Sequence, residues 1–403
     1  MVGGKWVLVG GLLVIAGLRY AGMEASKPDI KAGDVVRLLV RLDQAPREEW
    51  GKQVVSLRID RMRVEAKLGQ TPRLEYGDRV EIVGKLIPGV IGKPEESFGL
   101  ISSDFKVLDK DKGWMYWLNT MRVEMQSRLT RWISGDEGGL ASGILLGGGE
   151  MISGEGYNAF KKAGLLHVVA ASGYNVTVVS GWMMAVGWRI WGKRKAIYFG
   201  ILCVVLYVFL AGAGVAVIRA GVMSIMSLVA LRMGRPADAM WLLILAAAGM
   251  LAFNPMWITD IGFQLSVAAT AGLVGLDRLW WKKCPEELKT SLSAQAATWP
   301  LIAHHFGNLN VGAPIINLVT LWVVPLVMPV LAIALAVGSV WQGFGQVVAF
   351  LAWPPLAWMT GVARGVAGVP GINLEVARMS WGWVAGYYLV LAGGGYLLKL
   401  RKE

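Results

Sequence analysis

The sequence is poor in the residues that most often carry catalysis, bind metals or cross-link small folds. It has two cysteines and three histidines in 403 residues. Cys203 lies in an apolar run and Cys284 in a charged segment, so no disulfide framework is predicted. His167, His304 and His305 form no HxH or HExxH motif with a nearby Asp. The sequence therefore predicts no metal site and no cofactor.

Charged residues are also scarce. They make up 17% of the chain, against about 25% in an average soluble protein. Hydrophobic residues reach 55%, with nineteen tryptophans. They gather in repeated apolar runs of about 18 residues or more, the length that a helix needs to cross a bilayer. This pattern predicts a polytopic α-helical membrane protein.

The formal net charge of +12 is weak evidence for nucleic-acid binding by itself. Over residues 27–112, Lys and Arg nearly balance Asp and Glu. Most of the remaining positive charge lies in short loops between apolar runs, where the orientation of membrane helices explains much of it. The net positive charge is therefore evidence for membrane topology before it is evidence for nucleic-acid binding.

Residues 1–26 are predicted to form an N-terminal membrane anchor, uncleaved because no clear small-x-small site follows the apolar run. About 8–10 spans are expected in total, some of them broken or re-entrant. The positive-inside rule places the basic loops GKRK (192–195) and RMGR (232–235), and the C-terminus, on the cytoplasmic side. The same threading places residues 24–137 outside the cell. The further apolar segments lie at 165–191, 196–216, 217–233, 238–253, 261–281, 290–306, 312–338, 345–363 and 381–398.

Residues 27–112 are predicted to form a soluble β domain. Apolar residues at even positions from 36 to 42 alternate with Arg37 and Arg41, which is typical of a half-buried strand. Later segments repeat the alternation, giving about five short strands, and Gly84 marks a bulge or tight bend. The pattern suits an inserted small β-barrel of the OB-like type, and a plain β-sandwich fits it as well.

Residues 113–137 change to a helical period. The segment is predicted to be an amphipathic interfacial helix, since Trp and Arg edge one apolar face; a core helix of the soluble domain is the alternative. The apolar face consists of Trp114, Trp117, Met121, Met125, Leu129 and Trp132.

The next apolar segment, residues 139–150, is too short to span and carries three successive glycines, Gly147, Gly148 and Gly149. A re-entrant or broken helix is expected there. Its freed backbone groups would need partners from neighbouring protein, because the bilayer offers none.

Polar residues recur at predicted membrane depth. They are concentrated in residues 163–181, which also hold four small residues from Ala170 to Gly173. Two interpretations stay open: a packing seam in which polar groups bond across helices, or the lining of a conduit. In the first, Asp260 caps a helix and Arg219 extends to the interface. The polar residues are His167, Ser172, Asn175, Arg219, Asp260, Gln264, Ser266, Gln295, His305 and Asn317.

The sequence ILLGGGE followed by AFKKAGLLHVVAASGYNV resembles the competence-domain signature of the ComEC/Rec2 family of DNA-uptake channel proteins. Five later segments resemble the next family blocks in the same order: IRAGVM, GRPADAMW, FNPMWITDIGFQLSVAATAGL, SLSAQAATWPLIAHHFGNLN and INLVTLWVVPLVMP. The order and spacing of the blocks over residues 139–330 carry the resemblance. Asn175 stands where relatives often have His.

The resemblance implies that residues 138–403 form a competence-type transmembrane channel domain in a bacterial plasma membrane. The channel would pass single-stranded DNA inward during natural transformation, along the ten polar residues named above, with Gly147, Gly148, Gly149 and Gly173 supplying the re-entrant backbone. The OB-like domain would meet DNA outside, weakly and in a salt-sensitive way because its charge is near neutral. Its phosphate ligands would be Arg37, Arg41, Arg58, Arg61 and Arg63.

Partners follow from the same resemblance. Many relatives continue into a metallo-β-lactamase-like domain with an HxHxDH motif, which this sequence lacks, so we expect no enzyme activity here and a separate nuclease. No GxxxxGK[ST] loop is present, so a cytoplasmic ATP-driven motor is expected, with an extracellular DNA receptor and membrane lipid as further partners. Two alternatives stay open: a secondary transporter of a small solute, and a non-transporting scaffold whose polar residues pair with one another.

Overall fold

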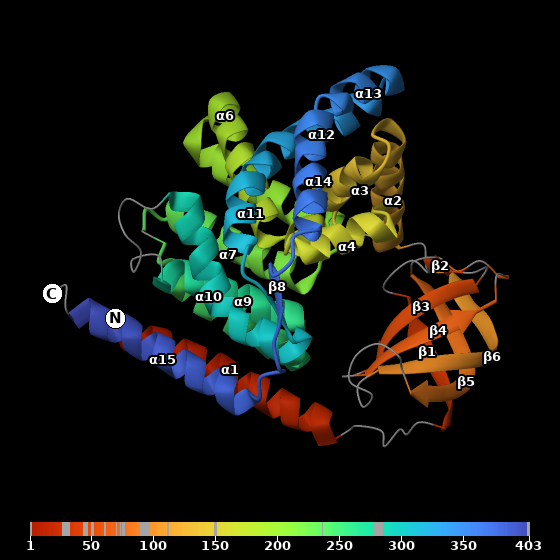
Figure 1. Cartoon of the computed structure of the whole chain (residues 1–403), viewed down its shortest axis with the longest axis horizontal. Coiled ribbons are helices and arrows are strands. Elements are labelled where there is room, and N and C mark those ends of the chain that lie inside the picture. The colour runs from red at the N-terminus through yellow and green to blue at the C-terminus, as the bar shows by residue number, and fades with distance from the viewer. Residues whose placement is uncertain are drawn as a thin grey trace. The chain divides into compact units, whose positions relative to one another are not determined.

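The computed structural model is mostly helical and separates into two compact units (Figure 1). The helical unit comprises Met1–Leu13, Arg122–Phe253 and Asp260–Glu403, and the strand unit comprises Val14–Met121 and Asn254–Thr259. The structure describes residues 2–25, 33–42, 47–49, 52–59, 62–69, 71–72, 74, 77–88, 97–110, 113–148, 151–235, 237–276 and 285–400.

The strand unit contains one six-stranded sheet in the order β1-β5-β6-β4-β3-β2. Its neighbouring strands are antiparallel except for the parallel pair β4–β6. β1 and β2 end this order, and among the described strands no pairing joins them into a closed barrel. The bounds are β1 Val35–Arg41, β2 Arg47–Glu49, β3 Lys52–Ile59, β4 Met62–Leu68, β5 Asp78–Pro88 and β6 Ser97–Lys110.

The period-two pattern decides which side chains form the core of the sheet. Val80 and Ile82 are fully buried, and β1 alternates between exposed and partly buried positions, with Arg37 and Arg41 exposed, as predicted. The register of β5 against β6 shifts at Val83/Gly84, which confirms the irregularity predicted at Gly84. The sequence therefore located these strands and their inward faces.

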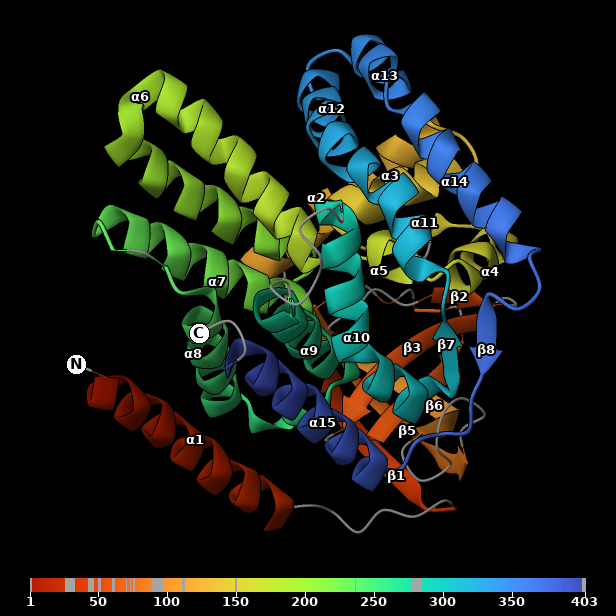
Figure 2. The ribbon, with the colours of Figure 1, turned by 60° about the vertical axis from the view of Figure 1, so that its left-hand side comes forward.

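The helical unit holds most of the helices. α6 folds back on itself at Gly192, whose φ is 76°, so that its two limbs pack side by side (Figure 2). A break was predicted there, because the basic loop 192–195 separates two apolar segments. α1 and α2 each continue from one unit into the other, and η2 belongs to the strand unit. The bounds are α1 Val2–Ala25, α2 Trp114–Trp132, α3 Asp136–Leu146, α4 Gly154–Lys162, α5 Leu166–Val169, α6 Gly173–Leu210, α7 Val215–Arg232, α8 Ala239–Phe253, η2 Pro255–Thr259, α9 Ile261–Leu276, α10 Glu286–Phe306, β7 Asn308–Asn310, α11 Ala313–Thr320, η4 Leu321–Val323, α12 Val324–Gly338, α13 Gln342–Phe350, α14 Trp353–Ala367, β8 Asn373–Glu375 and α15 Trp381–Leu400.

Within the described residues, three stretches are long and apolar enough to cross a membrane: Trp6–Met23, Val215–Arg232 and Ala313–Gly338. The pair α13 and α14, bent by 48°, would be a fourth. The apolar helices α8 and α9 are shorter than a full span. These helices indicate a multi-pass helical membrane protein, and the larger span count expected from the sequence stays a prediction.

The amphipathic helix predicted over residues 113–137 is present as α2, and the burial of its apolar side chains differs between its two ends. Trp114 and Trp117 are 60% and 63% exposed. Leu129 and Trp132, near the other end, are buried in the core of the helical unit. The last turns of α2 therefore behave as a core helix and its first turns do not.

Candidate functional site

α3 is the short apolar helix at the centre of the helical core. Its residues from Gly138 to Leu146 are all buried. A Cβ on Gly143 would lie 2.2 Å from the carbonyl oxygen of Val169, so only glycine fits at this position. Through this close approach α3 packs against α5, which lies within the polar and small-residue stretch 163–181.

The broken end of α3 obtains its hydrogen bonds from side chains on other helices. Asn175, 1% exposed, donates its Nδ2 hydrogen to the carbonyl oxygen of Ile144 at 2.8 Å. Gln126 donates to the carbonyl oxygen of Gly147 at 2.7 Å. Carbonyls in the last turn of a helix lack intrahelical partners, so these amides satisfy the freed backbone, as a broken helix requires. Gly147 and Gly148 have φ of 74° and 89°, and Gly149 lies outside the described residues.

Two other predicted path residues, Ser172 and His167, lie near Asn175 in the sequence, and only Ser172 forms a hydrogen bond with it in the structure. Ser172, just before α6, donates its hydroxyl hydrogen to Asn175 Oδ1 at 3.1 Å. His167 is exposed, and its Nδ1 lies 3.0 Å from the carbonyl oxygen of Gly164, three residues earlier. No described contact brings the His167 side chain to Asn175.

Arg219 carries a charge into the interior of the helical unit. Its side chain is 5% exposed, so it does not extend to an interface. Its Nε donates to the hydroxyl of Ser266 on α9 at 2.9 Å, and its Nη1 lies 3.1 Å from the sulfur of Met223. Nη2 is 3.3 Å from the position of a Cβ on Gly173 at the start of α6. Among the described residues no carboxylate forms an ion pair with Arg219.

α9 and α10 form a second polar group. The ring nitrogen Nε2 of His305 lies 2.8 Å from Gln264 Oε1. Asp260 accepts a hydrogen bond from the backbone amide of Phe263 at 3.0 Å, so its carboxylate caps the start of α9. The ring of Trp381, at the start of α15, lies 6.1 Å from that of His305. This group joins three helices through side chains.

A third polar group lies between α10, β7 and α11. Gln295 donates a hydrogen bond to the carbonyl oxygen of Asn310, and Asn317 donates to the hydroxyl of Ser291 at 2.8 Å. The amide oxygens of Gln295, Asn310 and Asn317 are buried and accept no hydrogen bond within the described part of the chain. This region therefore offers hydrogen-bond acceptors, whereas Arg219 offers donors.

The predicted path residues thus fall into separate local groups held by short hydrogen bonds: Ser172 with Asn175, Arg219 with Ser266, Gln264 with His305, and Asn317 with Ser291. His167 lies apart from them. None of them lines the pocket between α2 and the turn that follows α12. Within the ranges that the structure describes, no group of His, Cys, Asp or Glu could hold a metal ion. The arrangement provides hydrogen bonds and one buried cation.

The arginines predicted to meet DNA lie in the strand unit. Arg37 forms an ion pair with Glu81 across β1 and β5, although its side chain is 71% exposed. Arg58 and Arg63 stand opposite each other in the register of β3 and β4, and Arg61 lies outside the described residues. Two basic positions therefore face each other on neighbouring strands, while Arg37 already has an acidic partner.

One buried ionic group was not foreseen from the sequence. Asp136, in the first turn of α3, accepts hydrogen bonds from Arg364 on α14 at 2.8 Å and from the backbone amide of Ser153 at 2.9 Å. Burial acts to raise the pKa of Asp136, and the hydrogen bonds outweigh it, so the pKa lies below the ordinary value. Thr360 donates to the neighbouring Glu137 at 2.6 Å. The sequence feature that could have indicated this group is the acidic pair Asp136 and Glu137, which directly precedes a run of small residues.

Comparison with known proteins gives consistent results. The model of the family described as competence protein matches residues 144–401. The chain is 27% identical over 259 residues to ComE operon protein 3 of Bacillus subtilis strain 168, covering 60% of this chain and 32% of that protein. It is 28% identical over 243 residues to competence protein ComA of Neisseria gonorrhoeae, covering 55% and 34%. The chain thus spans about a third of the length of each relative. No solved structure matches.

Proposed function

Because this chain belongs to the competence protein family, whose model covers residues 144–401, we propose that it is a plasma-membrane channel for single-stranded DNA. It carries the strand inward during natural transformation. Its helical unit crosses the membrane about 8–10 times, with α3 as a broken or re-entrant element. The role is transport and not catalysis.

The observation that carries this proposal is the burial of Arg219. A guanidinium removed from water costs free energy unless an anion or several hydrogen-bond acceptors accompany it. Arg219 is 5% exposed and is met by a hydroxyl and a thioether, neither of them anionic. Phosphates of a passing strand are the anions that such a group binds best. The buried amide oxygens near α11 supply acceptors for base edges.

The strand unit acts in this proposal as an OB-like domain that receives DNA outside the cell. Support comes from the bulged β5 and from the open order of the sheet, since an OB fold is a partly open barrel; the sheet has six strands, one more than that fold. The opposed positions Arg58 and Arg63 would contact phosphates. A DNA receptor, a separate nuclease and an ATP-driven cytoplasmic motor act as partners.

A scaffold without transport is the alternative that a specific observation favours. Gln264 bonds to His305, and Asn317 bonds to Ser291, so several polar groups already satisfy one another across helices. If that is their whole role, substitutions there lower stability and leave no transport defect to measure.

The deciding experiment uses purified protein in liposomes, with fluorescent single-stranded DNA outside and an inward driving force. Arg219→Gln is compared with Arg219→Lys, which keeps the charge, and with Arg232→Gln, an exposed arginine at the end of the same helix. We expect protected DNA above empty liposomes for the wild type, Arg219→Lys and Arg232→Gln, and at least a tenfold loss for Arg219→Gln. Each variant is first checked for its unfolding midpoint.

Three outcomes contradict the channel. If Arg219→Gln unfolds earlier but transports normally per folded molecule, Arg219 is structural. Uptake of a small anion with no uptake of DNA favours the solute transporter. No uptake of either by the folded wild type, under the driving force, favours the scaffold.

A further inference from the structure

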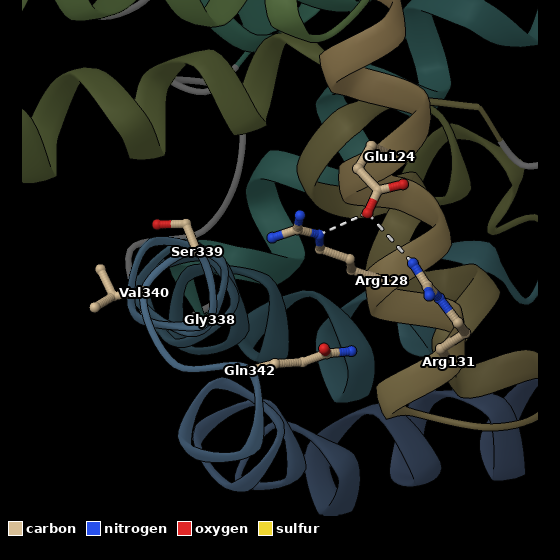
Figure 3. Close-up of a pocket in the computed structure, with 7 residues that line it drawn as sticks. All are labelled: Glu124, Arg128, Arg131, Gly338, Ser339, Val340 and Gln342. Atoms are coloured by element: carbon tan, nitrogen blue, oxygen red, sulfur yellow. Dashed lines mark hydrogen bonds and ion pairs between the residues drawn. The ribbon is translucent and has the colours of Figure 1, made fainter.

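A second basic site, which contains none of the predicted path residues, lies where α2 meets the turn between α12 and α13. It is a pocket of about 250 Å³ lined by Glu124, Arg128 and Arg131 on one side and by Ser339 and Gln342 on the other (Figure 3). In Figure 3 the Arg128 guanidinium points across the pocket toward the turn, and Gln342 points back toward α2. Donors therefore converge on the pocket from both sides.

The charge of this pocket is unbalanced. Glu124 Oε1 accepts from Arg128 Nε at 2.8 Å and lies 3.4 Å from Arg131 Nη2. One carboxylate thus serves two guanidiniums, which leaves one positive charge in excess. The hydrogen bond from Arg128 holds the pKa of Glu124 below its usual value, so the carboxylate is ionised at neutral pH. The terminal nitrogens of Arg128 have no partner among the described residues, so they are available to an anion.

Apolar side chains surround the turn beside the pocket. Val340 is 91% exposed, and Trp341 and Phe344 are 69% and 49% exposed, with their rings stacked at 6.0 Å. Val347 and Leu351 extend this surface along α13, with exposed fractions of 61% and 66%. So much exposed apolar surface in one place marks a site for a partner or a membrane. Trp beside Arg is the composition of a membrane interface.

We propose that this pocket binds the phosphodiester headgroup of an anionic phospholipid, whose acyl chains lie along the exposed side of α13. The excess positive charge matches a headgroup with one net negative charge. Guanidinium groups bind phosphate oxygens through two hydrogen bonds. A DNA strand fits the site less well, because Glu124 repels a polyanion and because apolar side chains, not a run of cations, continue the surface. The site is independent of the transport activity proposed above.

The test measures lipid binding to the full-length protein in dodecyl maltoside by native mass spectrometry. The probe is phosphatidylglycerol, and phosphatidylcholine with the same acyl chains is the uncharged comparison. We expect wild type to bind phosphatidylglycerol more tightly, and the double variant Arg128→Gln/Arg131→Gln to lose roughly tenfold in affinity. The matched control is Lys193→Gln/Arg194→Gln, which removes two exposed charges from the bend of α6 and should bind as wild type.

Two further variants separate lipid binding from misfolding. Glu124→Gln removes the competing carboxylate and should raise affinity for phosphatidylglycerol, a gain that a misfolded protein would not give. Trp341→Ser leaves the charges intact and should weaken binding of phosphatidylglycerol but not of glycerol 3-phosphate. Unchanged binding in Arg128→Gln/Arg131→Gln overturns the proposal. So does equal binding of glycerol 3-phosphate and the lipid by wild type, or a loss in that variant confined to a single-stranded oligonucleotide.

Discussion

The strand unit and the helical unit treat polar side chains in opposite ways. In the strand unit, Arg37 and Arg41 point outward, and among the described residues the buried Gln53 bonds to backbone groups of Gly69, Pro72 and Leu74, 16, 19 and 21 positions away. In the helical unit, buried polar groups bind partners on distant elements. Arg219 reaches Ser266, and Asp136 reaches Arg364, 228 positions away.

This difference follows from how strands and helices separate their buried side chains from their exposed ones. A strand alternates sides every residue, so polar side chains leave the core without disturbing the backbone. Helices that pack in a membrane protein gain little from the hydrophobic effect, because lipid is as apolar as their side chains. They associate instead through close packing at small residues and through hydrogen bonds. The helical unit should therefore be the more sensitive of the two to changes at small and polar positions.

Gly143→Ala should have the largest effect. The added methyl would lie 2.2 Å from the backbone oxygen of Val169, which cannot rotate away. We expect a loss of roughly 3 kcal/mol in the free energy of unfolding from the overpacked contact. The measurement is unfolding of the full chain in detergent, followed by tryptophan fluorescence.

Two glycine controls sharpen this comparison. Gly361→Ala on α14 meets no atom within 4 Å and should be neutral or stabilising by up to about 1 kcal/mol. Gly99→Ala in the strand unit meets only the flexible side chain of Ile87, at 3.0 Å, and should cost less than Gly143→Ala. Equal losses at Gly143 and Gly99 would contradict the difference between the units.

Asn175→Ala should have the next largest effect. It removes the donor to the Ile144 carbonyl and leaves a buried acceptor without a partner. A cost of about 2 kcal/mol is expected. Thr177→Ala is the control on the same helix, because Thr177 is exposed and bonds only to its own preceding turn. A loss no larger than that of the control would mean that water replaces the amide.

Asp136 makes the stability of the helical unit depend on pH. Its pKa in the folded protein lies below the ordinary value of 3.8. Its contribution is therefore complete above that value and is lost as the pH falls below it, through the folded-state pKa. We expect about 1–2 kcal/mol, discounted because Arg364 is largely exposed.

The measurement is the difference in unfolding free energy between wild type and Asp136→Asn, followed from pH 7 downward. The difference should be constant near neutrality and shrink below the ordinary aspartate pKa. A difference that does not change with pH would show that the carboxylate charge contributes nothing. Arg189→Gln, which changes an exposed charge on α6, should leave the profile unaltered.

The same contrast explains what could be predicted from the sequence. Alternation at residues 36–42 located β1 and its inward face, and Gly84 located the bulge, because both depend on local rules. The break at Gly192 was visible in the basic loop around it. The partners of Arg219 and Asp136 were not predictable, since each lies on an element whose placement depends on the whole fold. The sequence offered a helix cap as one interpretation of Asp260, which its hydrogen bond bears out, whereas the burial of Arg219 differs from the interfacial position expected under the same interpretation.

Glu81→Gln in the strand unit should have the smallest effect on stability and a measurable effect on binding. Its partner Arg37 has a side chain that is 71% exposed, so solvent screens the ion pair and the unfolding midpoint should not change measurably. Releasing Arg37 should make it available to phosphate, which strengthens the binding of single-stranded DNA and steepens its salt dependence by about 0.7 in log–log slope. Fluorescence anisotropy at several salt concentrations measures both, and Glu81→Gln/Arg37→Gln should restore the wild-type slope. A midpoint lowered as far as in Asp136→Asn would mean that the Arg37–Glu81 pair on the sheet stabilises as much as the Asp136–Arg364 pair between helices, and the contrast between the two units would fail.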